Sequence, residues 1–418
     1  MRDKQETKEL STTIEKQGYF RKVGHSGFVR GVFVGIATVF VSLGVISFVS
    51  TNQPITARQL EPAAKIREIF SILETHFVGE LDNDVLMDTM FTGLLYGVGD
   101  PYTSYMNRDA LARFLENTEG RYAGVGIRVQ PDFESNRIQV LQVFTGGPSY
   151  GSGLEPGDQI LQVNGIEVFA EQQEEAVAMI RGTPGTSVNI TLYRSFTNST
   201  FDVDIVRADV EVPTVEHRMI DNEIGFIRIS NFDRVTYQQF MDALNALEAG
   251  GMRGLVLDVR NNPGGLLDTV VRITNELVPS GLIVYTENRH GEREEMHGND
   301  RQVDIPLVVL VNEHSASASE VLAGAVRDTG SGVLVGARTF GKGVVQSLFP
   351  LSDGSGIKVT VATYYTPNGI SINGEGILPD VVVEKDRETS LRITTLEQWQ
   401  DQQLMTALDV VRAAVAAN

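Results

Sequence analysis

The pattern of hydrophobic and polar positions changes in character along the chain, and its first regime is a stretch without charge. From Gly31 to Ala57 there is no Asp, Glu, Lys or Arg, and residues 31–50 form the largely apolar run "GVFVGIATVFVSLGVISFVS". As an α-helix these residues span about 30 Å, the thickness of the hydrocarbon core of a bilayer. The pattern therefore predicts one transmembrane helix at 31–50.

The charge of the segment before this stretch predicts the orientation of the helix in the membrane. Residues 1–30 carry seven Lys and Arg against four Asp and Glu, and the positive-inside rule places such a segment in the cytoplasm. The chain beyond the helix would then be extracytoplasmic, at a bacterial cell surface or in a periplasm. A cleaved signal peptide is the alternative, but the apolar stretch is long for one and no clear Ala-x-Ala site follows it.

A helical region is predicted after a short polar linker. Residues 51–62 are polar and contain two prolines, which favours a tether. Within 63–117, apolar positions then recur at the spacing of one helix face. They are Ile66, Ile69, Phe70 and Leu73, followed by Met87, Met90, Phe91, Leu94 and Leu95. We expect a small helical domain, interrupted by the turn-like "GVGDPYTSYM".

The apolar period changes from helical to two at about residue 118. Short alternating runs such as "YAGVGIRV", "RIQVLQVF" and "SVNITLY" are separated by Gly, Pro and Asn turns, with one helical run, "EQQEEAVAMI". Residues 118–209 therefore predict a compact β-rich module.

Nearly continuous apolar strands define residues 210–386. The runs "IGFIRI", "GLVLDVR", "PLVVLVN" and "GVLVGAR" alternate with helical stretches near 234–248, 267–278 and 318–328. This alternation predicts an α/β domain whose sheet is buried on both faces. The tail, 387–418, reads as helical and polar. The predicted fold class is therefore multidomain α/β.

Composition excludes several functions. The formal net charge of -19 argues against a nucleic-acid partner, because phosphate neutralisation needs clustered Lys and Arg. The chain has no cysteine, which removes disulfides, thiolate catalysis and Cys-ligated zinc. Its six histidines show no H-E-x-x-H or comparable spacing, so no metal and no cofactor are expected.

The run "SASASE" (315–320) stands where chemistry is favoured in an α/β domain. It follows the strand "PLVVLVN" and precedes a helix, so its serines lie at the carboxyl end of a strand and beside a helix N-terminus. A serine there can act as a nucleophile next to amides that stabilise an oxyanion. Small residues can equally serve close packing, and this alternative stays open on the run alone.

A nucleophilic serine needs a base, and two candidates exist. His314 lies three residues before Ser317, and Asp258 ends the strand "LVLD", which allows a Ser-His-Asp triad. Lys342 lies between Gly341 and Gly343, where close backbone approach can bury a lysine and lower its pKa so that the amine accepts a proton. A solvated lysine at a hairpin is the plain alternative.

Two neighbouring patterns bear on this choice. "GARTFGKG" nearly matches a nucleotide-binding P-loop, but Gly343 replaces the required Ser or Thr, and "VVQSLF" continues as a strand rather than a helix. "DVRNNPGGLL" (258–267) follows a buried strand and can present backbone N–H groups to an oxyanion, although it also fits an ordinary turn.

The three segments "RNNPGG", "SASASE" and "TFGKGVVQ", in this order and after the β-rich module, resemble the carboxy-terminal processing proteases. The resemblance implies a crotonase-like and ClpP-like α/β core and a Ser-Lys dyad, with Ser317 as nucleophile and Lys342 as general base. It further implies that Gln346 orients the lysine. The oxyanion hole would combine the amide of Ala318 with that of Gly264 or Gly265.

The β-rich module resembles a PDZ domain. Its "YAGVGIRV" occupies the position of the loop that binds a peptide's terminal carboxylate, and "GLEPGDQILQVNGIEV" is similar to the PDZ centre. A PDZ domain adds a peptide as an extra strand and reads its C-terminus. The predicted peptide-binding residues are Gly124, Val125, Gly126 and Ile127.

Taken together, the sequence predicts a membrane-anchored, extracytoplasmic serine endopeptidase that cleaves unfolded or flexible proteins near their C-termini. The PDZ domain would recruit the substrate tail and gate activity, and the family resemblance implies a homo-oligomer. The alternative is a catalytically silent PDZ scaffold that binds peptide tails without cutting them.

Overall fold

The structure is a computed structural model that describes residues 57–299, 303–384 and 400–417. The predicted transmembrane helix at 31–50, with the segment 1–30 before it, lies outside these residues. No helix within the described ranges is long and apolar enough to cross a membrane.

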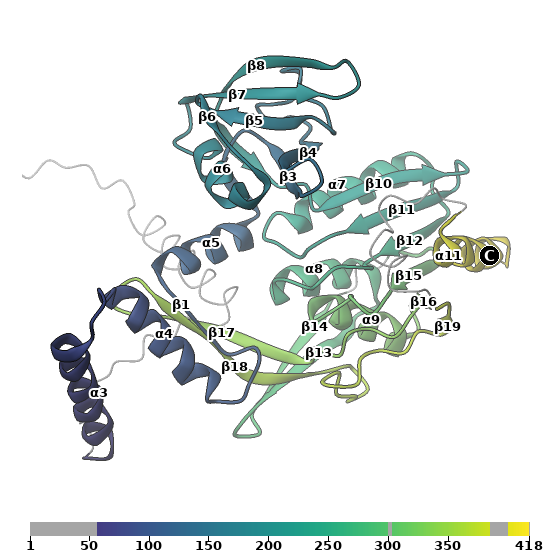
Figure 1. Ribbon diagram of the computed structural model, residues 1–418. Helices are drawn as coiled ribbons and strands as arrows, with labels where there is room; N and C mark the ends of the chain where they lie inside the picture. The colour runs from purple at the N-terminus through teal and green to yellow at the C-terminus, as the bar shows by residue number, and fades with distance from the viewer. Residues whose placement is uncertain (1–56, 300–302, 385–399, 418) are drawn as a thin grey trace, which may run out of the picture. The chain divides into compact units, whose positions relative to one another are not determined.

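The described part of the N-terminal region contains helices (Figure 1). Its helices are α3 (Ala57–His76), α4 (Asn83–Tyr96) and α5 (Arg108–Glu119). The helix α3 includes Pro62, so the predicted linker 51–62 is wrong at its end. Pro62 is the sixth residue of this helix and removes one N–H donor from its hydrogen-bond ladder. A short strand that the pattern missed, β1 (Ser104–Met106), pairs with a strand far along the sequence.

The β-rich module follows with strands close to the predicted runs. Its main sheet has the order β3-β4-β5-β7-β8, and β6 pairs with β5, while β2 and β9 form a separate ribbon. The elements are β2 (Arg121–Gly124), β3 (Ile127–Asp132), β4 (Arg137–Val143), β5 (Gln159–Val163), β6 (Ile166–Glu167), η1 (Ala170–Gln172), α6 (Gln173–Ile180), β7 (Ser187–Arg194), β8 (Ser199–Val206) and β9 (Ala208–Glu211). Ile138, Ile160 and Ile190 are fully buried in its own hydrophobic core.

The α/β domain is built on a second sheet of order β10-β11-β12-β15-β16-β19. Its strands are β10 (Val215–Ile220), β11 (Ile224–Ile229), β12 (Gly254–Asp258), β15 (Leu307–Val311), β16 (Val333–Gly336) and β19 (Val381–Val382). All are parallel from β11 to β19, and β10 is antiparallel to β11. Every residue of β12 and β15 is buried, which explains their continuous apolar sequences.

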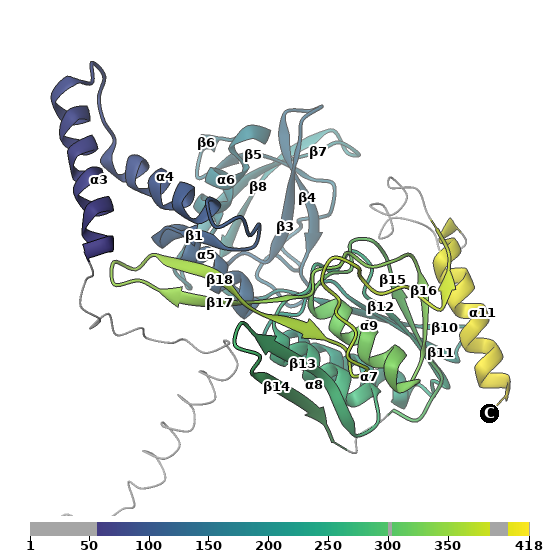
Figure 2. The same ribbon diagram turned by 90° about the horizontal axis from the view of Figure 1, so that it is seen from below.

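Helices cover both faces of this sheet. One face packs against α7 (Thr236–Ala249), α8 (Leu267–Leu277) and α9 (Ala318–Thr329). The other packs against the C-terminal helix α11 (Gln402–Ala417), which lies on the far side of the sheet from α8 and α9 (Figure 2). The prediction of a polar tail is therefore wrong for α11, since Leu404, Leu408 and Val411 are buried in the core.

A third sheet carries the segment that follows Lys342. It has the order β1-β18-β13-β14, with β17 also paired to β18. Its further strands are β13 (Gly281–Asn288), β14 (Arg293–Gly298), β17 (Val344–Pro350) and β18 (Gly356–Tyr365). Because residues 344–350 form a strand, the structure rejects the P-loop alternative.

Candidate active site

Ser317 is the N-cap of α9, directly after the loop that leaves β15. Its backbone has φ 55° and ψ -113°, a conformation that side-chain-bearing residues rarely adopt. The residue is also buried. Strained backbone at a helix N-terminus is typical of functional sites, because the surrounding structure must hold it in place.

The two outer serines of the run bind the loop that follows β12. Ser315 Oγ donates to the Val259 carbonyl oxygen at 2.8 Å, and Ser319 Oγ donates to the Asn262 carbonyl oxygen at 2.9 Å. The side chains of Ser315 and Ser319 are fully buried. They therefore have structural roles, which leaves Ser317 as the serine of the run that is open to chemistry.

Glu320 holds the serine loop and the lysine loop together, and the motif analysis missed it. Its buried carboxylate accepts hydrogen bonds from the backbone N–H groups of Ser317 (2.8 Å), Gly341 (2.7 Å) and Lys342 (2.9 Å). It also accepts from the Thr339 hydroxyl at 2.6 Å. The signal was present in the sequence, because Ser317-x-x-Glu320 has the spacing of a capping box.

The glycines around Lys342 allow the close backbone approach that the sequence predicts. A Cβ atom on Gly343 would lie 2.2 Å from the backbone nitrogen of Asn373, and one on Gly341 would lie 3.1 Å from that of Gly376. The segment 341–343 therefore runs against the loop 372–376, and a side chain at position 343 would collide with the backbone of that loop.

The environment of Lys342 favours its neutral form. Burial lowers the pKa of the Lys342 ammonium, the nearby charge of Lys358 lowers it further, and the carboxylates of Glu320 and Asp100 oppose both effects. The Lys342 Nζ atom lies 4.9 Å from the centre of the Tyr102 ring. The outcome is a pKa below the usual lysine value, which suits a general base.

One carboxylate oxygen of Glu320 holds the backbones of Ser317 and Lys342 close together. Their backbone nitrogens both donate to Glu320 Oε2, so they lie within the sum of those two hydrogen-bond distances. Among the described residues, no hydrogen bond joins Lys342 Nζ to Ser317. Burial raises the pKa of the Tyr364 hydroxyl, and the nearby Ser317 side chain acts against this rise. The backbones of the two predicted dyad residues thus lie close together, without a hydrogen bond between their side chains in the described part of the chain.

The other predicted partners lie elsewhere. Gln346 Nε2 donates to the Val344 carbonyl oxygen at 3.1 Å, and no hydrogen bond in the described part of the chain links it to Lys342. His314 Nε2 is buried and has no hydrogen-bond partner within the described ranges. The Asp258 carboxylate binds Arg228 and Arg260. The structure therefore does not assemble the alternative Ser-His-Asp triad.

The backbone N–H groups of Gly264 and Gly265 point in different directions. Gly264 N–H donates to Asn262 Oδ1 at 2.9 Å, so it is already used. The backbone of Phe232 bonds to the Gly264 carbonyl and to the Leu266 N–H, which leaves the Gly265 N–H pointing away from it. No acceptor for the Gly265 N–H occurs among the described residues. A Cβ on Gly264 would lie 2.9 Å from Ser317 Cβ, so this loop adjoins the serine.

We expect Gly265→Ala to disrupt the site. Gly265 has φ 143°, and an added Cβ would lie 2.3 Å from the Phe232 carbonyl oxygen, so the substitution should cost about 3 to 5 kcal/mol of unfolding free energy and abolish activity. Gly291→Ala is the matched control, because Gly291 also has positive φ (76°) but open space around it. Chemical denaturation measures both, and an equal cost in the two variants would contradict the clash.

Asp233, next to Phe232, predicts a pH dependence of stability. Burial raises the pKa of its carboxyl to about 6, with a hydrogen bond from Asn231 acting against this. An acid whose pKa is raised in the folded state loses stability as pH rises through its unfolded and folded pKa values. Asp233→Asn should therefore stabilise the protein by about 1 to 3 kcal/mol at pH near 8 and by much less near pH 4. Denaturant unfolding at the two pH values tests this, and an equal effect at both would contradict it.

The predicted carboxylate-binding residues of the β-rich module lie in the connection between β2 and β3. Gly126 has φ 78°, and the carbonyl oxygens of Val125 and Gly126 accept from Ser149 N–H and Phe144 N–H, both at 2.9 Å. A Cβ on Gly126 would lie 3.1 Å from Gly147 Cα. The loop backbone is thus fixed from one side, and Ile127 begins β3.

Comparison with known proteins identifies each part of this arrangement. Residues 223–383 match the model of peptidase family S41, residues 114–193 that of the PDZ domain, and residues 32–110 that of the N-terminal domain of the activating protease CtpB.

Two relatives are similar to this chain over most of their length. A carboxyl-terminal-processing protease of Synechocystis is 38% identical over 333 residues, which are 78% of this chain and 77% of the relative. The carboxy-terminal processing protease CtpA of Bacillus subtilis is 33% identical over 84% of this chain and 76% of its own. A putative S41 protease structure from Bacteroides fragilis, 16% identical, superimposes with a TM-score of 0.51 over 77% of this chain and 90% of that chain.

The fold, the serine at its helix cap and these matches define a serine-type peptidase with a PDZ domain. More particularly, the chain belongs to the family of carboxyl-terminal processing proteases within peptidase family S41.

Proposed function

We propose that this protein is a Ser-Lys endopeptidase that cleaves unfolded or flexible proteins near their C-termini. One observation carries the dyad: the backbone N–H groups of Ser317 and Lys342 share Glu320 Oε2 as acceptor. From this separation the flexible four-carbon stem of Lys342 can bring its amine to the serine hydroxyl.

In the proposed mechanism the Ser317 hydroxyl oxygen attacks the scissile carbonyl carbon, and the neutral amine of Lys342 takes the serine proton. The Ala318 N–H, at the start of α9, and the Gly265 N–H stabilise the oxyanion. Lys342 then passes its proton to the leaving amine, which leaves an acyl-enzyme on Ser317. Water, deprotonated by Lys342, hydrolyses the ester.

The described conformation is a resting state in this proposal. For catalysis the Lys342 amine leaves the Tyr102 ring and Ser317 exchanges its contact with Tyr364 for one with Lys342. Catalytic hydrogen bonds often tighten only when substrate is bound. Gln346, whose side chain now bonds to Val344, orients the lysine in the active arrangement.

Recruitment and location complete the proposal. The PDZ loop 124–127 binds the terminal carboxylate of the substrate and gates activity, and an N-terminal helix at 31–50 anchors the enzyme with its catalytic part outside the cytoplasm. The names of the relatives, which describe carboxyl-terminal processing, support the substrate class. The core sheet with helices on both faces is consistent with a crotonase-like and ClpP-like architecture.

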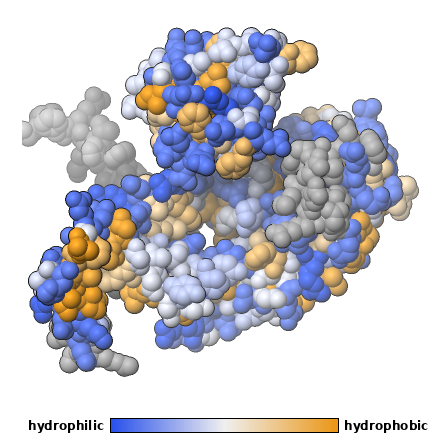
Figure 3. Space-filling view, in the orientation of Figure 1, coloured by the Kyte–Doolittle hydropathy of each residue, from blue (hydrophilic) through white to orange (hydrophobic). Residues whose placement is uncertain are grey.

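The helices α3 and α4 support a homo-oligomer. Hydrophobic side chains gather over them at the lower left of the space-filling view (Figure 3). The large exposed ones in these two helices are Ile66, Ile69, Ile72, Val85, Leu94 and Tyr96. Such an exposed apolar face favours burial against another surface, and a second copy of the same helices would provide one.

Cleavage of an unfolded protein in the presence of a tail peptide tests the proposed function. We expect turnover that the peptide stimulates and that requires Ser317. A protein that binds the tail peptide in a fluorescence assay but never cuts would instead favour the silent PDZ scaffold.

A further inference from the structure

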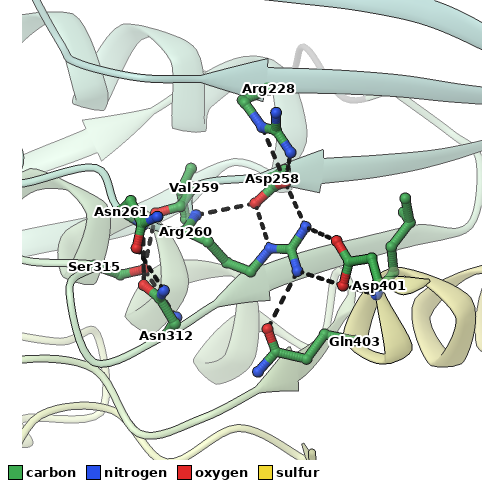
Figure 4. A network of polar contacts seen from close by, with 10 residues as sticks. Arg228, Asp258, Val259, Arg260, Asn261, Asn312, Ser315, Asp401 and Gln403 are labelled. Atoms are coloured by element: carbon green, nitrogen blue, oxygen red, sulfur yellow. Dashed lines mark hydrogen bonds and ion pairs between the residues drawn. The ribbon is translucent and has the colours of Figure 1, made fainter. Parts of the chain in front are cut away.

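A buried charge network centres on Arg260, in the loop after β12 (Figure 4). The Arg260 guanidinium donates to both carboxylate oxygens of Asp258 and to both of Asp401, at 2.7 to 2.9 Å. Its remaining hydrogen bond goes to Gln403 Oε1 at 3.2 Å. Asp258 also accepts from Arg228 at 3.0 Å. All donors of the Arg260 side chain are therefore satisfied without water.

The partners of Arg260 come from two distant parts of the chain. Asp258 belongs to β12, whereas Asp401 and Gln403 stand at the start of α11. The side chains of Asp258 and Arg260 are fully buried, and that of Asp401 is 3% exposed. Gln403 Nε2 additionally donates to the Val383 carbonyl oxygen at 2.7 Å. The C-terminal segment thus places a charge inside the α/β domain rather than on its surface.

The loop that Arg260 begins is the one that approaches the nucleophile. Asn261 N–H donates to Asn312 Oδ1 at 2.9 Å, and Ala316 N–H donates to the Asn262 carbonyl oxygen at 3.0 Å. Asn262 Oδ1 in turn accepts from Gly264 N–H. Consecutive residues from Arg260 to Gly264 therefore connect the C-terminal segment to the residues around Ser317.

We propose that the C-terminal segment is a working part of the active-site scaffold: Asp401 and Gln403 are positioning residues that hold Arg260 and, through the loop 260–265, the oxyanion-binding amide of Gly265. This inference rests on the proposed function for the role of Gly265. Asp401 Oδ1 also accepts from the Leu404 N–H at 3.1 Å, in the first turn of α11, a cap that Asn can also provide. Its proposed effect on the active site passes through Arg260.

Charge balance explains why the position of Arg260 and of the loop 260–265 depends on Asp401. Burial works to raise the pKa of Asp258, but the charge and hydrogen bonds of Arg260 and the charge of Arg228 outweigh it and keep the carboxyl ionised. Arg228 and Arg260 thus bind the two aspartates, and the charge of Arg218 also acts on both carboxylates. Removing the charge of Asp401 leaves an uncompensated buried cation, and the backbone of the loop 260–265 must move to bring Arg260 closer to water.

The test compares Asp401→Asn with two variants that loosen the same helix elsewhere. Leu408→Ala removes a buried apolar contact of α11, and Arg412→Ala breaks an exposed ion pair between α11 and Asp221. We expect Asp401→Asn to lower kcat by about 10- to 100-fold with KM within about threefold. The two control variants, compared at a temperature where each is fully folded, should keep kcat within about twofold.

Hydrogen exchange of the backbone amides gives a readout that does not require turnover. Exchange in residues 260–266 should quicken at least about tenfold in Asp401→Asn and stay unchanged in Arg412→Ala. Asp401→Glu, which restores the charge, should recover part of kcat. If Asp401→Asn fails to fold, Gln403→Ala replaces it in the same measurements. This variant removes a neutral hydrogen-bond partner of Arg260, so we expect kcat to fall by about three- to tenfold.

Different outcomes would overturn the positioning role of the C-terminal segment and the proposed peptidase function. An unchanged kcat and unchanged exchange in Asp401→Asn, or an equal loss of kcat in Leu408→Ala, would overturn the positioning role while leaving the peptidase intact. Parent protein without Ser317-dependent turnover would defeat the proposed function, and the exchange comparison would still decide whether the C-terminal segment holds the loop.

Discussion

Lys342→Ala lowers kcat/KM for an unfolded protein substrate by at least about 10³-fold, because the serine loses the group that takes its proton. Lys342→Arg does not restore activity, since a guanidinium stays protonated at every accessible pH. Both variants keep the fold, because the Lys342 side chain donates no hydrogen bond to any residue that the structure describes. Initial rates across a pH series, with circular dichroism as the folding control, measure the effect.

The same experiment gives a pH profile whose sign follows from the lysine environment. Activity requires the neutral amine, so it rises as pH rises through the pKa of Lys342 and then reaches a plateau. The lowered pKa places this rise below the ordinary lysine range. Lys358→Ala is the matched variant: it removes a neighbouring positive charge, so the pKa of Lys342 and the midpoint of the rise should move to higher pH, with the plateau unchanged.

Activity that survives Lys342→Ala and follows a group with a pKa near the histidine value would contradict the dyad. The alternative base would then be His314, which lies three residues from Ser317 and whose Nε2 atom has no hydrogen-bond partner in the described part of the chain.

Glu320→Ala should have the second large effect, because it removes the acceptor of four hydrogen bonds at once. We expect a loss of about 3 to 5 kcal/mol in unfolding free energy and, at a temperature where the variant is folded, about 10²- to 10³-fold in kcat/KM. The backbone N–H groups of Ser317 and Lys342 would lose the acceptor that they share, and the two residues would move apart.

Glu320→Gln separates charge from hydrogen bonding. The amide retains an oxygen for two of the backbone donors, so the loss in kcat/KM should be only about tenfold. Removing the negative charge also lowers the pKa of Lys342, because the Glu320 carboxylate raises it, and the rise of activity should begin at lower pH than in the parent. An unchanged rate and midpoint in both Glu320 variants would contradict the shared-anchor account.

The fold was predictable where one physical pattern dominated. The strands β11, β12 and β15 lie close to their predicted runs, because a strand buried on both faces must be continuously apolar. The three-residue strand β1 was missed, since its pairing with β18 depends on a segment far along the chain. The apolar stripe of α11 was overlooked although Leu404, Leu408, Val411 and Val415 have helical spacing.

The site was predictable only as far as local motifs reach. Ser317 and Lys342 stand in recognisable surroundings, and the Ser-x-x-Glu spacing could have indicated Glu320. Tyr102 and Tyr364 could not be found, because only the folded chain brings these distant residues to the dyad. The choice between Gly264 and Gly265 depends on the direction of each amide, which the hydrogen bond to Asn262 reveals and residue type does not.

Cleavage of an unfolded protein by the purified parent and by its Ser317→Ala, Ser315→Ala and Ser319→Ala variants tests the central claim most directly, with product masses locating the cuts. The account predicts cuts near the substrate's C-terminus, their complete loss in Ser317→Ala, and residual cleavage in the two outer variants, whose hydroxyls only bind the loop after β12. Unchanged cleavage by Ser317→Ala, at the same bonds, would contradict it.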